Sequence, residues 1–240
     1  MQRLIDDADG VSTLASRISD VTGIPADHIE KDFWVTETLR GVTAYAAEHG
    51  VPVLFKGGTS LSKAFKLIQR FSEDVDLLVV LPQDATDGAR DRVLKDFVGA
   101  AAAATGLEPQ PDSTSATRGV KRSVRLHYRQ SEDFGLSRGV LLELGSRGGT
   151  LPHVEMPIMS LIGEHLPDEI AGFVEATPFN ATVLAPVRTL AEKLVLLHTA
   201  SVEDLAANAV RTARHYYDVF CLLGAPVVLA ELNAGTMAML

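Results

Sequence analysis

Residues 55–63 read FKGGTSLSK and residues 70–80 read RFSEDVDLLVV, and together they give the clearest structural signal in the chain. They predict a strand, a glycine turn, a short helix and a second strand that begins with alternating acidic residues. Residues two apart on a strand face the same side, so Ser72, Asp74 and Asp76 are expected to share one face. Two carboxylates that converge there suit a hard divalent cation such as Mg2+, which prefers oxygen ligands.

The glycine turn adds a second kind of chemistry. Gly57 and Gly58 free backbone N–H groups at the start of a helix, where phosphate binds well. Asp is a poor strand former, and burying Asp74 and Asp76 without a metal or a cationic partner would be costly. We therefore favour a metal site over ordinary strand-edge acids. A phosphate-binding turn beside metal-binding carboxylates is typical of enzymes that transfer phosphoryl or nucleotidyl groups.

The composition indicates a globular protein, with 240 residues of which 46% are hydrophobic and 22% charged. A chain of this length can bury the core of one large domain or of two small ones. No apolar run reaches the ~18 residues that span a bilayer, and the acidic, polar N-terminus does not resemble a signal peptide. One cysteine, Cys221, cannot form an intrachain disulfide, which fits a reducing cytoplasmic location. The lack of a spanning apolar run predicts that a membrane is not a partner.

The net charge of −9 argues against a non-specific nucleic-acid coat protein but is compatible with a local basic channel. Any single basic residue is more often a solvated surface charge than a ligand contact. If the channel binds an RNA acceptor, Arg122 and Arg125 are expected to contribute. The basic residues cluster around the motif and downstream of it, at Lys56, Lys63, Lys66, Arg70, Arg118, Lys121, Arg122, Arg125 and Arg129.

The expected fold class is α+β, with a mixed sheet and flanking helices over residues 1–180 and a helical C-terminal part over residues 181–240. Asp27 is expected to cap the second helix. The strand that contains Asp74 is apolar on both faces beyond Asp76, which predicts a central place in the sheet. A polar loop is expected at 109–117, and the strands at 120–130 and 138–146 should form an antiparallel pair. The predicted helices are 11–22, 27–49, 59–68, 84–105, 187–198 and 202–223, and the predicted strands are 51–56, 73–81, 120–130, 138–146 and 182–184.

Glu143 and Lys193 have two interpretations each, and Asp218 has an ordinary structural one. Glu143 lies inside an apolar strand and is either a third carboxylate of the acidic cluster or the partner of an arginine. Lys193 either offsets triphosphate charge or is a surface lysine. Asp218 follows Arg214 by four positions, the spacing of an ordinary helix-surface ion pair. No metal-ligand spacing links the histidines His127, His198 and His215, which we expect to be packing or surface residues.

These motifs resemble the nucleotidyltransferase superfamily, whose pattern is a Gly-Gly or Gly-Ser turn followed by an Asp-x-Asp strand. The longer context is similar to the AbiEii/AbiGii-type nucleotidyltransferase toxins, including the MenT group. The resemblance runs from about residue 28 to residue 223, through EKDFWVT at 30–36, the two central stretches, LAEKL at 190–194 and RHYYD at 214–218. Members often continue through further C-terminal helices, so a shorter helical part or a truncated chain is expected here.

The resemblance implies a nucleotidyltransferase-like core and the toxin of a toxin–antitoxin system. Such an enzyme uses Mg2+ and a nucleoside triphosphate, transfers the nucleotide and releases pyrophosphate. In MenT-like members the acceptor is the 3′ end of tRNA, which blocks translation. The expected partners are therefore a nucleoside triphosphate, tRNA and a cognate antitoxin, which is kinase-like for some members.

The resemblance also suggests roles for individual residues. Asp74 and Asp76, with Glu143 as the third candidate, would hold the metal. Lys193 would contact the donor phosphates and Asp218 would complete the active site. Ser72 would lie beside the phosphates and is a candidate for regulatory phosphorylation. The expected nucleotide contacts are Gly57, Gly58, Ser60, Lys63, Ser72 and Lys193.

Two other functions remain open from the sequence. A nucleotidyltransferase that modifies a small molecule or a protein side chain would need a closed acidic pocket, whereas an RNA-modifying enzyme would need a long basic groove. A non-catalytic nucleotide-binding module is the second alternative, and the intact pair Asp74 and Asp76 argues against it.

Overall fold

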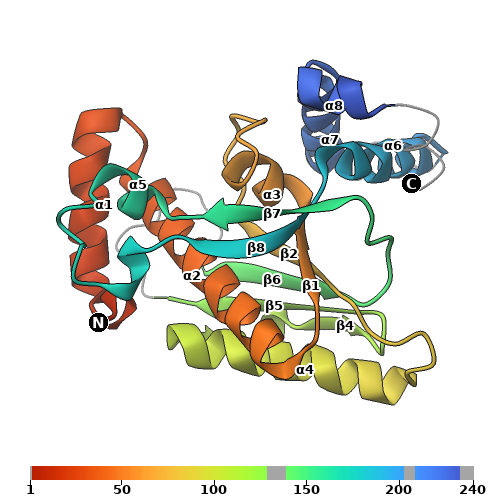
Figure 1. Cartoon of the computed structure of the whole chain (residues 1–240), viewed down its shortest axis with the longest axis horizontal. Coiled ribbons are helices and arrows are strands. Elements are labelled where there is room, and N and C mark those ends of the chain that lie inside the picture. Colours follow the sequence, from red (N-terminus) through yellow and green to blue (C-terminus); the bar gives the residue numbers. More distant parts are fainter. Residues whose placement is uncertain (1, 129–138, 203–208, 233–240) are drawn as a thin grey trace.

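The strand that begins with alternating acids lies in the middle of the sheet, as predicted. This strand, β2 (Asp74–Val79), pairs antiparallel with β1 (Val53–Lys56) and parallel with β6 (Val140–Gly145). Figure 1 presents the structure, a computed structural model that describes residues 2–128, 139–202 and 209–232. Within these ranges the mixed sheet has eight strands in the order β3-β5-β6-β2-β1-β8-β7, with β4 paired to β5, and the fold class is α+β.

The other elements surround this centre. The remaining strands are β3 (Glu108–Pro109), β4 (Ser115–Thr117), β5 (Lys121–His127), β7 (His153–Ile158) and β8 (Phe179–Leu184). The α-helices are α1 (Ala8–Thr22), α2 (Ala26–His49), α3 (Gly57–Lys63), α4 (Asp87–Thr105), α5 (Leu161–His165), α6 (Pro186–Val202), α7 (Ala209–Leu223) and α8 (Pro226–Glu231). Short 3-10 helices occupy Leu4–Asp6, Pro111–Ser113 and Val174–Ala176.

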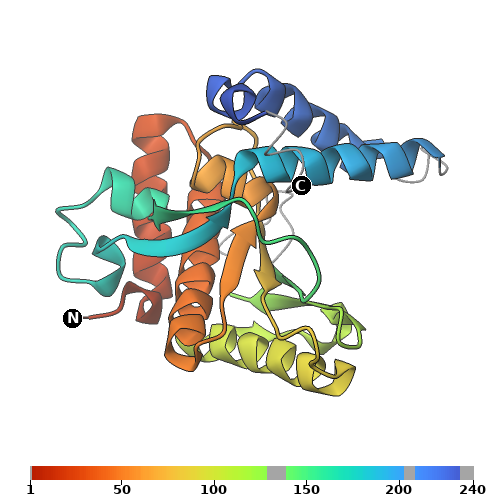
Figure 2. The ribbon, with the colours of Figure 1, turned by 45° about the vertical axis from the view of Figure 1, so that its right-hand side comes forward.

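Helices α2 and α4 cover one face of the sheet (Figures 1 and 2). The alternation of β2 explains this packing, because Val75, Leu77 and Val79 are fully buried in the main core. Burying each such side chain stabilises the fold by about 2 kcal/mol. Asp74 and Asp76 point to the other face, which α2 and α4 do not cover. The hydrophobic core thus lies on one side of β2 and its acidic residues lie on the other.

The C-terminal helices α6, α7 and α8 gather at the opposite end of the molecule from α4 (Figures 1 and 2). They share a second apolar cluster in which Leu190 and Leu222 pack with Leu61 of α3. The chain leaves the sheet only at Leu184, so the predicted boundary after residue 180 falls inside β8. A division into two domains stays a prediction, and the end of β8 is the place where the structural context changes.

Helix α2 ties together the segments that build the acidic face. Lys31 is fully buried, and its Nζ lies 2.8 Å from Glu73 Oε2 just before β2. The neighbouring Asp32 accepts hydrogen bonds from Lys63 Nζ at 2.6 Å and from the Leu161 backbone N–H at 2.7 Å. The EKD part of the 30–36 motif therefore links α2 to β2, α3 and α5.

Two helix predictions need correction. Asp27 does not cap α2, because the N-cap position is Pro25 without a side-chain bond, and the Asp27 carboxylate accepts from the His28 backbone N–H instead. The helix predicted at 59–68 is α3, which begins at Gly57 and ends at Lys63. Lys66 adopts a left-handed backbone with φ 54°, which a continuing helix does not allow.

Several other segments differ from the predictions or lie outside the described residues. Strand β7 and helix α5 were not predicted, and the loop predicted at 109–117 contains β4 and a 3-10 helix. The antiparallel pairing of β5 with β6 is confirmed, whereas residues 129–138 between them and residues 203–208 of the last predicted helix fall outside the described part. In the described part of the chain, every helix is too short or too polar to cross a membrane.

Candidate functional site

A row of side chains crosses four adjacent strands at one level. Asp76 stands opposite Lys56 of β1 and Glu143 of β6, and Glu143 stands opposite Ser123 of β5. Directly paired residues point to the same face of a sheet, so these four side chains share the face away from α2 and α4. Asp74 lies two residues before Asp76 and faces the same way. The strand register alone thus gathers three carboxylates.

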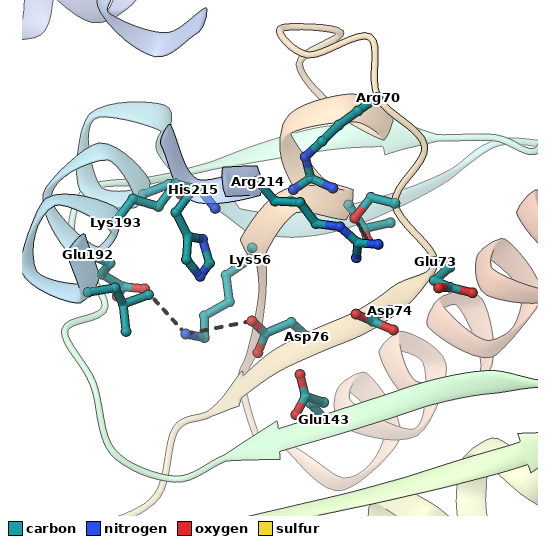
Figure 3. A pocket seen from close by; sticks show the side chains of 16 residues that line it. Lys56, Arg70, Glu73, Asp74, Asp76, Glu143, Glu192, Lys193, Arg214 and His215 are labelled. Carbon is teal, nitrogen blue, oxygen red and sulfur yellow. Dashed lines mark hydrogen bonds and ion pairs between the residues drawn. The ribbon is translucent and has the colours of Figure 1, made fainter. Parts of the chain in front are cut away.

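Lys56, Asp76 and Glu143 of this row form, with Asp74, the floor of a cavity of about 190 Å³ bounded by the sheet, α3, α6 and α7 (Figure 3). Its walls come from segments that are far apart in the sequence. The lining residues are Lys56, Gly57, Gly58, Thr59, Arg70, Ser72, Glu73, Asp74, Asp76, Glu143, Thr189, Glu192, Lys193, Leu196, Arg214 and His215.

The carboxylates of Asp74, Asp76 and Glu143 turn toward the same space (Figure 3). Burial raises the pKa of Asp76 to about 6, against the opposing effect of Lys56, and Glu143 adds to the increase. Burial also raises the pKa of Asp74, and the nearby Glu73 and Glu143 raise it further. The cluster therefore carries negative charge that its own surroundings do not fully neutralise.

This donor set fits a hard divalent cation, because carboxylate oxygens are the ligands that Mg2+ prefers. Among the described residues, no three His, Cys, Asp or Glu side chains are already close enough together to hold a metal ion. Like charges repel one another, so the three carboxylates would have to draw together around the ion. The site supplies the right ligand chemistry without an assembled coordination shell.

The Gly-Gly turn keeps the rim of the cavity narrow. A Cβ atom at Gly58 would lie 2.4 Å from an Arg70 guanidinium nitrogen and 3.0 Å from Ser72 Oγ. Gly57 has φ +78°, and a Cβ atom there would lie 2.9 Å from Asp76 Oδ2. Glycine is therefore required at both positions for the turn to approach the carboxylates and the arginine this closely.

Cationic side chains line the cavity across from the carboxylates (Figure 3). Arg70 and Lys193 are fixed by Asp218, which is fully buried on α7. Arg70 donates two hydrogen bonds of 2.7 Å to the two Asp218 oxygens, and Lys193 Nζ lies 2.7 Å from Oδ2. Burial would raise the pKa of Asp218, but the bonds from Arg70 and Lys193 outweigh burial and lower it.

Lys56 brings a further ammonium group to the floor. Its Nζ lies 3.9 Å from Asp76 Oδ2 and 3.3 Å from Glu192 Oε2 of α6. Burial lowers the pKa of Lys56, but Asp76 and Glu192 outweigh burial, so the pKa ends above its usual value. Lys56 is therefore a cation shared between the sheet and α6.

The structure brings most of the predicted site residues together. Asp74, Asp76, Glu143, Lys193, Ser72 and both glycines line the first cavity. Glu143 accepts a 3.1 Å hydrogen bond from Ser123 and faces the two aspartates. This placement agrees with the interpretation of Glu143 as a third carboxylate of the acidic cluster.

Other predicted residues lie elsewhere. Asp218 is buried behind the cations, so the helix-surface pair with Arg214 is replaced by tertiary contacts, and Arg214 itself lines the cavity. Ser60 is buried and donates to the Gly57 carbonyl. Lys63 binds Asp32 and does not reach the first cavity.

Arg122 also departs from its prediction. Its guanidinium lies 2.9 Å from Asp91 Oδ1 on α4, on the face of the sheet opposite the carboxylates. Arg125 is three residues further along β5 and faces the carboxylate side, where it stands in register with Leu141, the partner of Asp74. Only one of these two arginines can therefore face an acceptor at this site.

Sequence reasoning missed Lys56, Glu192, Thr189 and His215 as lining residues. Lys56 had a usable signal, since it immediately precedes the Gly-Gly turn. Glu192 and His215 stand beside Lys193 and Arg214 in the downstream motifs, but their direction depends on helix orientation, which the sequence does not give. His215 was expected to be a packing or surface residue, and it faces the cavity instead.

A second cavity of about 480 Å³ lies behind α3 and shares Thr59, Arg70 and Ser72 with the first. Its walls include Ile24, Pro25, Phe71 and Leu161, and His28 packs against Phe71 with a ring-centroid distance of 4.3 Å. Ser72 lines both cavities and accepts a 2.9 Å hydrogen bond from Thr59 Oγ1.

The raised pKa of Asp76 predicts a pH-dependent effect of Asp76→Asn. The folded pKa of about 6 exceeds the ordinary value of 3.8, so ionised Asp76 destabilises the folded state above about pH 6, and protonation relieves this penalty as the pH falls. In EDTA at about pH 8, Asp76→Asn should melt a few degrees above the wild type, and this difference should shrink toward about pH 5. Asp84→Asn, at an exposed site, should give no such trend. Equal melting temperatures of Asp76→Asn and wild type at about pH 8 would contradict the assignment.

Comparisons with known proteins find one family model and a similar solved structure. The family model for the nucleotidyl transferase AbiEii toxin of type IV toxin–antitoxin systems matches residues 42–239. No curated protein matches the chain in sequence. Among solved structures the chain is similar to MenT4, a nucleotidyltransferase toxin from Mycobacterium tuberculosis H37Rv, with a TM-score of 0.48 and 20% sequence identity. That match covers 78% of the chain, which spans 58% of the MenT4 chain. The family match extends from α2 through the C-terminal helices, and the chain belongs to the AbiEii nucleotidyl transferase toxin family of type IV toxin–antitoxin systems.

Proposed function

We propose that the first cavity binds a nucleoside triphosphate with Mg2+ and transfers its nucleotidyl group to an RNA 3′ hydroxyl, most specifically the 3′ end of tRNA. The observation that carries this proposal is the division of the cavity into a carboxylate floor and a cationic wall, joined by a glycine turn. Family membership supports the reaction class. RNA and nucleoside triphosphates are both cytoplasmic, where we place the protein, and a cognate antitoxin is its expected partner.

Asp74, Asp76 and Glu143 would hold the divalent cation. When bound, the ion would neutralise charge on the reacting phosphate and make the attacking hydroxyl more acidic. The raised pKa values of Asp74 and Asp76 favour binding of a cation, since a nearby positive charge stabilises their ionised forms.

Lys193 and Arg70 would contact the leaving phosphates. In the transfer, the acceptor oxygen forms a bond to the α-phosphorus, the bond from that phosphorus to the β-phosphate oxygen breaks, and the hydroxyl proton is released. Negative charge then develops on the departing pyrophosphate. Cations fixed in advance by Asp218 stabilise this charge without reorganising.

The acceptor would approach over β5 and β6, beside Glu143. Ser123 and Arg125 face this side of the sheet, next to the carboxylates. A basic side chain here binds a nucleic-acid backbone through charge, so that binding weakens as salt rises. This local basic contact is compatible with the acidic net charge of the chain.

Incubation with each labelled nucleoside triphosphate, Mg2+ and total RNA tests the function. The wild type should label RNA, and Asp74→Ala should lower the rate at least about a hundredfold, because the carboxylate would hold the catalytic cation. Asp84→Ala, at an exposed carboxylate, should keep the wild-type rate. Label in protein or in a small molecule with none in RNA would support the alternative acceptors, and absence of any transfer would support a non-catalytic binding module.

The two arginines of β5 give a matched test of the acceptor side. Arg125→Glu should weaken tRNA binding about tenfold and make it less dependent on salt, because a phosphate contact is lost. Arg122→Glu makes the same charge change on the opposite face and should alter tRNA binding much less, although it breaks the pair with Asp91. Binding by filter retention over a range of salt concentrations measures both effects. Equal losses in the two variants would contradict this acceptor path.

Ser72 is the candidate for regulation by phosphorylation. A phosphoserine carries about −1.5 to −2 charge and would repel an incoming triphosphate from the cavity that Ser72 lines. Ser72→Glu should therefore weaken triphosphate binding at least about tenfold in calorimetry, whereas Ser72→Ala should retain it. Ser62→Glu is the control, since Ser62 lines only the second cavity. Wild-type affinity in Ser72→Glu would remove the hypothesis.

A further inference from the structure

Lys56 occupies an unusual position for a lysine at the end of a strand. It stands in register with Asp76, and its Nζ lies 3.9 Å from Asp76 Oδ2 and 3.3 Å from Glu192 Oε2. The contact with Glu192 is a hydrogen bond, whereas the contact with Asp76 is a longer ion pair, so the two carboxylates share the ammonium group unequally. The side chain is 24% exposed, because it faces the open cavity. Lys56 therefore has room to move between its two partners.

Lys31 offers a contrast at the other end of the acidic segment. Its side chain is 0% exposed, and its Nζ lies 2.8 Å from Glu73 Oε2. A fully buried ammonium group with a close partner is a fixed part of the fold, because moving it would leave a buried charge without compensation. Lys56 is partly exposed and its Nζ lies 3.9 Å from Asp76 Oδ2, so it can give up this contact while its hydrogen bond to Glu192 remains.

Glu192 is the carboxylate to which Lys56 donates a hydrogen bond. Its other carboxylate oxygen, Oε1, lies 3.6 Å from Arg188 Nε one turn earlier on α6. Glu192 lies on α6, the helix that also carries Lys193, and on the opposite side of Lys56 from Asp76. The contact with Arg188 orients the Glu192 carboxylate along this helix. A shift of Lys56 toward Glu192 would uncover Asp76 while keeping the ammonium group paired.

We propose that Lys56 is a resident counter-ion of the metal-free cavity, and that it gives up its ion pair with Asp76 and keeps its hydrogen bond to Glu192 when a divalent cation binds the carboxylate floor. This inference rests on the proposed function, since it assumes that Asp76 is a metal ligand. Lys56 and the metal then compete for Asp76, and Glu192 favours the metal-bound arrangement because it keeps the lysine paired. Lys56 and Glu192 are positioning residues in this scheme, and they act through Asp76.

Calorimetric titration with Mn2+ alone, without nucleotide, tests the competition. Lys56→Met should bind Mn2+ about fivefold more tightly than the wild type, the change that corresponds to roughly 1 kcal/mol of ion-pair energy. Lys66→Met is the matched control, because Lys66 pairs with Glu164 away from the floor and its removal changes the net charge equally. Lys66→Met should therefore bind Mn2+ as the wild type does.

Glu192→Gln tests the role of Glu192 as the partner of Lys56. It should weaken Mn2+ binding about fivefold, the change expected for losing one such ion pair. Glu164→Gln is its charge-matched control. In the Lys56→Met background, Glu192→Gln should have no further effect, because Glu192 acts through the lysine. This cycle separates an exchange of partners from a general effect of charge. The Glu192→Gln arm also stands alone if Lys56→Met does not fold.

The outcomes distinguish the inference from the proposed function. Tighter Mn2+ binding by Lys56→Met together with a lost Glu192 effect in the double variant supports the exchange. If the wild type binds Mn2+ and transfers nucleotide but Lys56→Met binds no more tightly than Lys66→Met, the exchange is wrong and the function stands. If the wild type binds no Mn2+, both the metal site and the exchange are wrong.

Discussion

The buried carboxylate of Asp218 holds three distant parts of the chain in one arrangement. It lies on α7 and binds Arg70 from the loop before β2 and Lys193 from α6. An unpaired carboxylate in this interior would be costly, so losing both cations would penalise the folded state by several kcal/mol, roughly 3–5 for an uncompensated buried charge. The cationic wall of the cavity, and with it the position of the C-terminal helices against the sheet, depends on this contact.

The rest of the site is organised around incompletely neutralised negative charge. Glu73 has Lys31, Asp76 shares Lys56 with Glu192, and Asp218 has two cations. The pKa of Asp76 nevertheless stays raised to about 6, so the nearby cations do not offset burial and repulsion. Residual electrostatic strain of this kind is common at functional sites, where a ligand relieves it. The incompletely neutralised charge at the cavity lowers the stability of the folded state. Hydrophobic packing of α2 and α4 against the sheet offsets this loss.

Local patterns in the sequence were enough to predict the centre of this structure. The alternation in β2 predicted the common face of Asp74 and Asp76, the apolar run beyond Asp76 predicted the central place of the strand, and the class α+β followed from the order of the elements. Strand β7 escaped prediction because it lies at the sheet edge, is mostly exposed and contains Pro157, so it lacks the usual strand pattern. Edge strands carry the weakest signal because only their neighbours in space define them.

The tertiary contacts were harder to predict, for two different reasons. The i,i+4 spacing suggested Arg214 as the partner of Asp218, but helix α7 turns Asp218 toward Arg70 and Lys193, a direction that no local rule supplies. The faces of Arg122 and Arg125 were available from the sequence, because residues three apart on a strand point to opposite sides. The first case marks a limit of local patterns, and the second a period-two signal that was not used.

The opposed halves of the cavity have a consequence for ligand binding under the proposed function. A divalent cation alone would relieve the carboxylates of Asp74 and Asp76, and would leave the two cations Arg70 and Lys193 with the single carboxylate of Asp218. A triphosphate alone would satisfy these cations and add negative charge beside the floor. Each ligand therefore improves the electrostatic environment of the other, and their affinities must be coupled by the same factor in both directions. Because Lys56 contacts both Asp76 on the sheet and Glu192 on α6, this coupling involves a contact between the sheet and α6.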